Sequence, residues 1–458
     1  MSRPTRSRFR TLLDVSLLGL ALIGPQAASA QADLPDYVIA EFGTPPAIPT
    51  GDLSPDLQQA VAVVFVESLA QSLWTTNQQE ALADIVAADD PRLAWLISDM
   101  MRFTWRRDFD DALAQAAADL LGIEYTAFRR WDELTNHLIA WDIPAYPGYL
   151  AHKRGIFTHF VPGWDRIFVE GDIDWRMVSW GGVLIDDRPF GMDELCNCIP
   201  AVDNPEVETA AEATWLDEDD VVFGIEINGE ARAYPRQIME VREMVNDTLG
   251  GRDLGIPYCT LCGAMQAYFT DDVPGAVTRP VLRTSGLLIR SNKVMYDRAT
   301  WSVFDTFLGR AVTGPLAEAG VVLDQATVLT TTWGAWKEAH PDTTVLVEEL
   351  ALGRDFDFRN GRDANGPIFP VGDVDPRLAV QDDVIGVVTA SGTPVAFERG
   401  AAQLALQSGA EVTFENVRLA LDAGGIRAVG QDGEDLGSHQ AFWFAWSQFH
   451  PDTALWTP

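Results

Sequence analysis

The chain has 458 residues, with 67 Asp or Glu against 33 Lys or Arg, which gives a formal net charge of −34 at pH 7. A surface this acidic repels nucleic acid and anionic lipid, which argues against both as partners. Hydrophobic residues make up 47% of the sequence, enough for a sizeable core, and the length predicts two or three domains.

The first thirty residues have the pattern of an export signal. Four arginines precede the apolar run LLDVSLLGLALIG, and Ala28-Ser29-Ala30 has the small side chains of a cleavage site. The run is too short to span a bilayer stably. We therefore expect residues 1–30 to be a signal peptide. The mature protein is expected to be periplasmic or secreted, without stable membrane insertion, where disulfides are permitted.

Residues 31–123 are predicted to form a helical module. Ser54-Pro55 has the pattern of an N-cap followed by proline at the first helical position, and apolar residues follow at helical spacing. The stretch EALADIVAADDPRLAWLISDMM resembles helical-hairpin repeats of the HEAT type, with an ordinary bundle as the alternative. We expect this module to pack against the rest of the chain or to recruit a protein partner.

Residues 124–170, which are rich in aromatic residues, proline and glycine, are predicted to be a connector. From about residue 171 to 458 the pattern changes to short strands and turns. The segment VVFGIEINGEARAYP predicts a hairpin around Asn228-Gly229. The expected fold class is α+β, a helical N-terminal module followed by a mixed, mainly antiparallel β-rich domain.

A helix is predicted to follow Pro235, over RQIMEVREMVNDTLGG, and to end at Gly250-Gly251. Glu243 would then lie near the C-terminal end of this helix, where an acidic side chain opposes the helix dipole. Such a position can mark a functional carboxylate, although acidic residues near a helix end are also ordinary.

The 4 cysteines form two close pairs, Cys196-Asn-Cys198 and Cys259-Thr-Leu-Cys262. Three interpretations are open. Disulfides are common in exported chains. The sequence C-x-x-C-G also forms the turn of zinc and iron knuckles, and thiolate pairs suit copper(I). Finally, Cys259 and Cys262 could form a reversible dithiol, although the residues after Cys262 look like a strand rather than the helix of a thioredoxin-like site.

A second polar cluster lies in RTSGLLIRSNKVMYDRATWSVFD, residues 283–305. Its candidate catalytic residues are Asn292, Asp297 and Arg298. The carboxylate and guanidinium could pair across a turn, or could hold a ligand carboxylate or phosphate. A structural turn with a satisfied ion pair is the alternative.

Seven segments resemble, in order, the bacterial family known as domain of unknown function 3179, from about residue 175 to the C-terminus. They are IPAVDNP, ARAYPRQIMEVREMVNDTLGG, YCTLCGAMQAYF, SGLLIRSNKVMYDRATWSVFD, GRAVTGPL, TTWGAWKEAHPDT and FWFAWSQFHPDT. The resemblance implies a fold unit but no reaction, because the activity of the family is unknown. It also implies that the second cysteine pair and the Asn292, Asp297 and Arg298 cluster match motif positions. Arg242 stands where relatives often have a histidine, and Cys196 and Cys198 look peculiar to this chain.

The function expected from the sequence is an exported, thiolate metal-binding protein with copper or zinc at Cys259 and Cys262. Cys196 and Cys198 are further candidate ligands. One alternative is an enzyme, either a thiol–disulfide oxidoreductase or a hydrolase that uses the polar cluster. Another is an interaction scaffold with structural disulfides. The sequence names no substrate.

Overall fold

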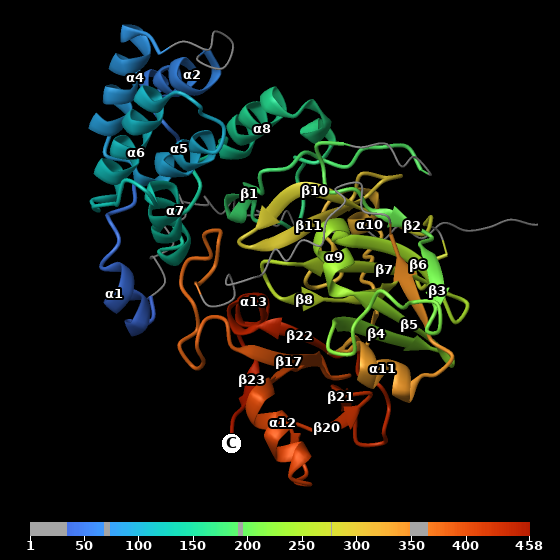
Figure 1. The fold of residues 1–458 in the computed structure, drawn as a ribbon. Coiled ribbons are helices and arrows are strands. Elements are labelled where there is room, and N and C mark those ends of the chain that lie inside the picture. Colours follow the sequence, from blue (N-terminus) through green and yellow to red (C-terminus); the bar gives the residue numbers. More distant parts are fainter. Residues whose placement is uncertain (1–33, 68–73, 191–195, 276, 349–364) are drawn as a thin grey trace, which may run out of the picture.

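The computed structural model describes residues 34–67, 74–190, 196–275, 277–348 and 365–458 (Figure 1). The predicted signal peptide lies outside these residues. No helix in the described ranges is both long enough and apolar enough to cross a membrane.

Helices dominate the chain up to residue 160. They are α1 (Asp36–Phe42), α2 (Pro55–Ala62), α4 (Thr76–Ala87), α5 (Ala94–Met101), α6 (Arg107–Leu121), α7 (Arg130–Ala140) and α8 (Tyr149–Phe160), with a π-helical turn at Val63–Glu67 and 3-10 turns at Pro91–Leu93, Pro162–Arg166 and Trp175–Met177. As predicted, the Ser54 side chain caps α2 by accepting a hydrogen bond from the N–H of Leu57. The unequal lengths of α4 to α7 give no support to a HEAT-type repeat.

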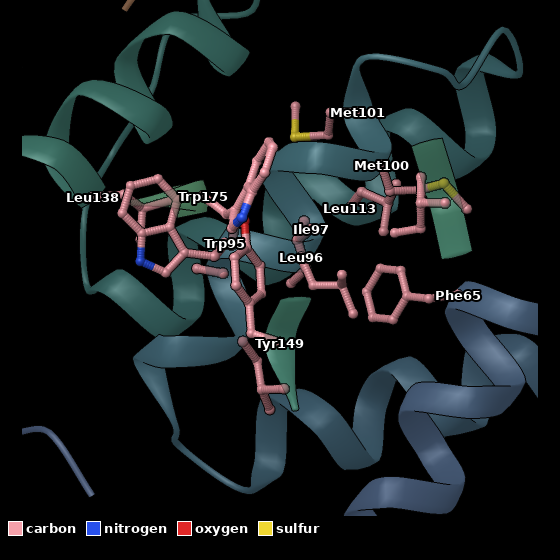
Figure 2. Packing of buried hydrophobic residues seen from close by; sticks show 14 of the residues in the cluster. Phe65, Trp95, Leu96, Ile97, Met100, Met101, Leu113, Leu138, Tyr149 and Trp175 are labelled. Atoms are coloured by element: carbon pink, nitrogen blue, oxygen red, sulfur yellow. The ribbon is translucent and has the colours of Figure 1, made fainter. Parts of the chain in front are cut away.

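The helices share one hydrophobic core with part of a β-sheet. Trp95, Leu96 and Leu113 pack at its centre (Figure 2), and the same cluster continues to Leu287 and Val294 in the strands. Burial of these large apolar side chains is the main force that holds the helices on the sheet. The helical segment is therefore packed into the fold and is not an independent module.

The sheets overturn the predicted fold class. Five sheets form the blades of a five-bladed β-propeller, and helices are spread through the chain, with 31% helix and 27% strand. The expectation of a helical module followed by a β-rich domain was wrong because strand periodicity identifies strands but not how separate sheets are arranged. The blades contain both antiparallel and parallel strand pairs.

The strands of the first three blades come from distant parts of the chain. The first blade is β1 (Val178–Trp180), β10 (Leu282–Ile289), β11 (Asn292–Asp297), β12 (Val303–Asp305) and β13 (Arg310–Ala311). The second is β14 (Gln325–Ala326), β9 (Ala267–Phe269), β7 (Arg252–Cys259), β6 (Met244–Leu249) and β2 (Val202–Asp203), with β8 (Ala264–Met265) on β7. The third is β15 (Leu329–Thr332), β4 (Val221–Ile227), β5 (Glu230–Pro235), β16 (Thr344–Val347) and β3 (Glu206–Thr209).

The last two blades lie near the C-terminus (Figure 1). One is β22 (His439–Phe442), β17 (Asp383–Val388), β18 (Pro394–Glu398) and β23 (Ala454–Trp456), and the other is β19 (Thr413–Phe414), β20 (Val417–Asp422) and β21 (Gly425–Val429). Short helices connect the strands, namely α9 (Arg236–Arg242), α10 (Gly314–Glu318), α11 (Trp333–Ala339), α12 (Arg399–Gln407) and α13 (Trp443–Phe449).

Two local predictions met different outcomes. The hairpin at Asn228-Gly229 is confirmed, because β4 and β5 pair across these two residues, both of which have positive φ. The helix predicted to continue to Gly250 is wrong. It stops at Arg242, Glu243 takes a left-handed φ of 54°, and the residues from Met244 form strand β6, which pairs with β7.

The chain contains an internal duplication. In the third blade β4 and β5 form a hairpin, β15 pairs antiparallel with β4, and β16 pairs parallel with β5. In the fourth blade β17, β18, β22 and β23 repeat the same arrangement. In each copy the hairpin leads into a helix, α9 or α12, and the two outer strands are joined by a second helix, α11 or α13.

Side-chain contacts repeat with the topology. Trp336 donates to Thr343 at 2.9 Å and stacks near His340, with ring centroids 4.1 Å apart. Trp446 donates to Thr453 at 2.9 Å and lies 4.2 Å from His450. These residues belong to the repeated pattern W-x-x-W-x-x-x-H-P-D-T, which begins at residues 333 and 443. Two copies of one unit explain why two of the family segments, TTWGAWKEAHPDT and FWFAWSQFHPDT, look alike.

The copies differ in the length of the segment that precedes the first of the two outer strands, β15 in one copy and β22 in the other. In the first copy residues 260–328 separate β7 from β15, whereas in the second only residues 430–438 separate β21 from β22. The longer insertion carries Cys262 and the whole polar cluster of residues 283–305. Of the residues predicted to carry chemistry, Cys259, Cys262 and the polar cluster therefore lie in the first copy and its insertion, whereas Cys196 and Cys198 precede it.

Candidate functional site

Two reduced cysteines lie at the end of β7. Cys259 is the last residue of the strand, and the chain turns back so that the N–H of Cys262 donates to the carbonyl of Cys259 at 3.2 Å. The Sγ atoms are 2.8 Å apart, and both side chains are buried, with 4% and 0% exposed. The Ser291 carbonyl oxygen lies 3.4 Å from each sulfur, and Asn292 Oδ1 lies 3.6 Å from Cys262 Sγ.

The pKa values of the two thiols are shifted in opposite directions. Burial raises the pKa of the Cys259 thiol, but hydrogen bonds from Cys262 and from the backbone N–H groups of Lys293, Cys262 and Leu261 outweigh burial and leave its pKa below the ordinary value. Burial raises the pKa of Cys262, and the neighbouring Cys259 raises it further. The pair therefore has one sulfur suited to be a thiolate and one that keeps its proton.

A cavity of about 510 Å³ lies beside this turn. Thr260 and Leu261, the two residues between the cysteines, form part of its wall. Most of the remaining lining is apolar and comes from β10, β11 and the segments before β2 and β17. A mostly apolar cavity with a few polar groups is the usual form of a small-molecule site.

A buried ion pair supplies two of the charged groups of the cavity, and Glu240 is a third. Lys293 Nζ contacts Glu243 Oε2, and Thr260 Oγ1 donates to Glu243 Oε1 at 3.1 Å. Burial lowers the pKa of Lys293 to about 7, a shift that the nearby carboxylate opposes because it favours the ammonium form. A lysine with this pKa can exchange a proton near neutral pH.

The backbone at Glu243 is held in an unusual conformation. This residue ends α9 with a φ of 54°, its N–H donates to the carbonyl of Met239, and its carbonyl accepts from the N–H of Tyr258 in β7. A non-glycine residue in the left-handed region is uncommon and is often found at functional sites. The sequence marked Glu243 as a carboxylate at a helix end, whereas the structure places it at a helix-to-strand junction facing Lys293.

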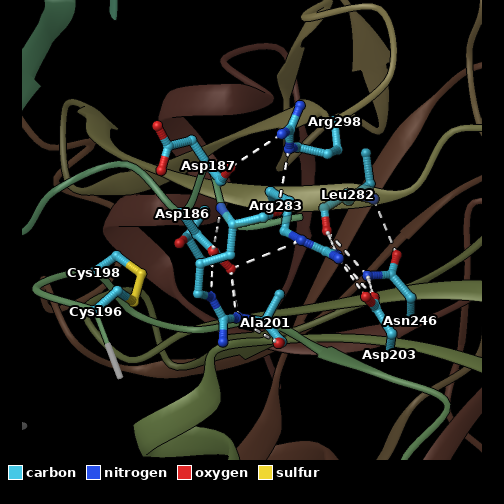
Figure 3. Close-up of polar contacts among 12 residues, drawn as sticks. Asp186, Asp187, Cys196, Cys198, Ala201, Asp203, Asn246, Leu282, Arg283 and Arg298 are labelled. Carbon is cyan, nitrogen blue, oxygen red and sulfur yellow. Dashed lines mark hydrogen bonds and ion pairs between the residues drawn. A yellow bond between two sulfur atoms is a disulfide. The ribbon is translucent and has the colours of Figure 1, made fainter. Parts of the chain in front are cut away.

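Cys196 and Cys198 form a disulfide, with their Cα atoms 5.0 Å apart (Figure 3). The four cysteines therefore do not form one four-thiolate site. Ligand atoms of this pair and of Asp186 lie within 4.8 Å of one another, so Asp186, Cys196 and Cys198 could bind a metal ion. The carboxylate of Asp186 already accepts hydrogen bonds from Arg188 and from the N–H of Ala201, which would compete with a cation.

The predicted catalytic cluster is not brought together. Asn292 begins β11 and lies beside Cys262, whereas Asp297 ends the same strand, about 16 Å away at some 3.3 Å per residue. The Asp297 carboxylate accepts from the N–H groups of Val281 and Thr300, and so closes a turn. Arg298 donates to the backbone carbonyls of two residues, Asp187 and Arg188 (Figure 3). Asp297 and Arg298 thus have structural contacts, and the predicted catalytic roles of all three residues stay predictions.

A family model described as "Protein of unknown function (DUF3179)" matches residues 196–434. The chain belongs to this family. The match confirms the resemblance given by the sequence, and it includes both cysteine pairs, Glu243 and Lys293 of this DUF3179 protein. The curated proteins and the solved structures yielded no match to the chain.

Proposed function

We propose that this DUF3179 protein is a thiol–disulfide oxidoreductase, with Cys259 as the nucleophile and Cys262 as the second thiol. The observation that supports this proposal is a pair of sulfurs 2.8 Å apart whose thiol pKa values are shifted in opposite directions. An acidic first thiol attacks, and a second thiol that keeps its proton until the mixed disulfide forms then resolves it.

The proposed reaction balances without an added cofactor. The Cys259 thiolate attacks one sulfur of a substrate disulfide, the substrate S–S bond breaks, and the leaving thiolate takes up a proton. Cys262 then loses its proton and attacks Cys259 Sγ, which releases the second substrate thiolate. The products are the Cys259–Cys262 disulfide and two substrate thiols. Lys293 and Glu243, in the adjacent cavity wall, are placed to exchange the proton.

Metal binding fits the Cys259 and Cys262 pair less well. Among the described residues, the cluster of three metal-binding side chains is Asp186, Cys196 and Cys198, and no third side chain of this kind joins Cys259 and Cys262. Structural zinc sites in proteins almost always use four ligands.

The proposal is tested by measuring the reduction potential of the pair. In the Cys196→Ser, Cys198→Ser variant, Cys259 and Cys262 are the two remaining cysteines. The variant is equilibrated in glutathione buffers of defined potential before alkylation and peptide mass spectrometry. We expect reversible two-electron oxidation with a midpoint between about −120 and −270 mV, the range of thiol–disulfide oxidoreductases. Thiols that stay reduced at every potential while the protein is folded, or a midpoint below about −300 mV, would overturn the proposal.

A second candidate function is metal binding at Asp186, Cys196 and Cys198. It is favoured because the ligand atoms of these three residues all lie within 4.8 Å of one another. It requires reduction of the disulfide, because thiolates are the ligands of copper(I) and zinc. The reduced protein is titrated with zinc or copper(I) and analysed for bound metal. This candidate predicts one equivalent in the wild type and none in the Cys196→Ser, Cys198→Ser variant. Equal binding by both proteins would exclude it.

Export and partner recruitment are part of the proposal. The N-terminal arginines, the apolar run and the cleavage site Ala28-Ser29-Ala30 support delivery to the periplasm or the exterior. Cell fractionation with N-terminal sequencing of the mature protein tests it, and a chain retained in the cytoplasm with residues 1–30 intact would contradict it. Recruitment of a protein partner by the helical segment stays a prediction.

A further inference from the structure

Lysine is rare in this chain. Of the 33 Lys and Arg residues, three are lysines, namely Lys153, Lys293 and Lys337, and all the others are arginines. An arginine stays charged in proteins, whereas a lysine can lose its proton and then act as a nucleophile. A buried lysine in such a chain therefore differs from the buried arginines in the chemistry that it can perform.

Two of the three lysines have ordinary surroundings. Lys153 is fully buried, and its ammonium group donates to the Asp99 carboxylate, the Tyr149 hydroxyl and the carbonyl of Val178, at 2.6, 3.1 and 2.6 Å. Its three N–H donors thus have three acceptors. Lys337 lies in α11, with 32% of its side chain exposed. Neither lysine borders the cavity beside the cysteine turn.

Lys293 does border that cavity, together with Glu243 and Thr260. Its side chain is 11% exposed, and its Nζ contacts the Glu243 carboxylate, which Thr260 holds from the other oxygen. Burial lowers the pKa of Lys293 to about 7, so part of the population carries a neutral amine near neutral pH. A lysine desolvated in an apolar pocket is a typical nucleophile for Schiff-base formation with carbonyl compounds.

The rest of the cavity wall restricts the kind of carbonyl compound that fits. The volume of about 510 Å³ suits a small molecule, and Leu287 and Val294 contribute apolar surface from β10 and β11. Buried Glu240 adds a second carboxylate to that of Glu243, and Arg236 approaches Glu240 at 3.5 Å from outside the lining. In the part of the chain that the structure describes, no arginine lines the cavity. Two carboxylates and one ammonium disfavour a ligand that carries its own negative charge.

We propose that this cavity binds an uncharged aldehyde or ketone with an apolar body and holds it as an imine on Lys293. The apolar body lies against the side chains of β10 and β11, and the carbonyl carbon lies at the end of the cavity where Lys293, Glu243 and Thr260 meet. This inference goes beyond the proposed oxidoreductase function, because the imine forms without either Cys259 or Cys262.

The proposed step balances without an oxidant or a reductant. Lys293 passes one proton to Glu243, and the neutral amine attacks the carbonyl carbon, so that a C–N bond forms and the C=O bond opens. The oxygen takes up one proton from the nitrogen and one from Glu243 and leaves as water. The products are an iminium ion, a Glu243 carboxylate and water. Because the iminium carries the same charge as the original ammonium, Glu243 keeps a cationic partner and no buried charge is left unpaired.

Reductive trapping in the full-length protein tests this inference. The protein is incubated with pentanal and sodium cyanoborohydride near neutral pH, and peptide mass spectrometry measures the pentyl group on each lysine. We expect modification of Lys293 to be about tenfold faster than that of Lys337, the internal control, and to level off as the pentanal concentration rises, because the aldehyde binds before it reacts. At Lys337 the rate should stay proportional to concentration, and Lys153 should stay unmodified.

Glutaric semialdehyde is the matched control probe, because it has the chain length and the aldehyde of pentanal but also a carboxylate. It should modify Lys293 about tenfold more slowly than pentanal does. The Lys293→Arg variant keeps a cation beside Glu243 but cannot form an imine, so its intact mass should show only the slow modification at Lys337.

Two results would overturn the inference. Equal rates at Lys293 and Lys337, or a Lys293 rate that does not level off with pentanal, would show a lysine without a binding site. Equal rates of the two probes at Lys293 would show that the cavity does not select an uncharged carbonyl compound.

Discussion

The Sγ atoms of Cys259 and Cys262 lie 2.8 Å apart, yet the pKa of the first thiol is lowered and that of the second is raised. The difference arises from hydrogen-bond donors that point at Cys259 and not at its neighbour. The reactivity of the pair therefore depends on a contact between the two side chains as well as on the backbone turn that joins them.

Replacing Cys262 by alanine should make Cys259 less acidic. The substitution removes the thiol that donates to the Cys259 sulfur, so burial is less well offset and the pKa of Cys259 should rise by about one unit or more. Thiolate absorbance and the pH dependence of iodoacetamide labelling measure this change. In the reciprocal Cys259→Ala variant, Cys262 should stay unreactive at neutral pH. Equal labelling of the two single-cysteine sites would contradict the assignment.

Removing the lysine of the Glu243 and Lys293 pair should be strongly destabilising. Lys293→Met leaves the Glu243 carboxylate buried without its cation, a change that typically costs about 3–5 kcal/mol. Adding Glu243→Gln to the same variant removes the unpaired charge and should recover most of the loss. Urea unfolding of the wild type, both single variants and the double variant gives the coupling energy. Additive losses would show that the two side chains act independently.

The duplicated units predict matched effects of matched substitutions. The ring of Trp336 covers Gly224, and the ring of Trp446 covers Gly386, so closely that a Cβ on either glycine would overlap the indole. Gly224→Ala and Gly386→Ala should each lower the free energy of unfolding by about 1–3 kcal/mol, the usual cost of overpacking. Gly229→Ala is a poor control because of its positive φ, whereas Gly155→Ala adds a methyl group in open space within α8. A neutral result at only one of the two glycines would argue against equivalent packing.

Local features of this fold were predictable from the sequence, and long-range ones were not. Asn228-Gly229 has a strong turn preference that depends on two residues, and Ser54 caps a helix through a contact three residues away. The end of α9 is not visible in the sequence, because Val245, Asn246 and Asp247 continue a plausible helical pattern, although their pairing with β7 makes them a strand. The duplication had a visible signal in the repeated W-x-x-W-x-x-x-H-P-D-T pattern.

The candidate site was predicted in part. The cysteine pairs were identified, but the sequence could not distinguish which pair forms a disulfide, because pairing depends on geometry that spacing does not fix. Lys293 is not among the predicted site residues, although a lysine beside the apolar residues of a strand is a useful signal of a buried charge. Its partner Glu243 is fifty positions away in the sequence, so only the fold could bring the two together.

Acid should destabilise the protein through His439. Burial, with a smaller contribution from the nearby His450, lowers the pKa of His439 to about 3. In the unfolded chain a histidine has a pKa near 6.5, so between about pH 6.5 and 3 the unfolded state binds more protons than the folded state. Stability therefore falls as the pH drops through this window, and His439 alone should account for about 2 kcal/mol of loss at pH 5.

The His439→Gln variant tests this contribution, because glutamine carries no charge at any pH and can still accept a hydrogen bond from Gln325, whose Nε2 lies 2.9 Å from His439 Nδ1. Urea unfolding at pH 7 and pH 5 should show a smaller loss in the variant than in the wild type, by about 2 kcal/mol. His159→Gln, at an exposed histidine, should leave the wild-type loss unchanged. If both variants lost as much stability as the wild type, protonation of His439 would not be coupled to unfolding, and the acid sensitivity would have to come from other groups, namely the carboxylates or His450, whose pKa burial lowers to about 4.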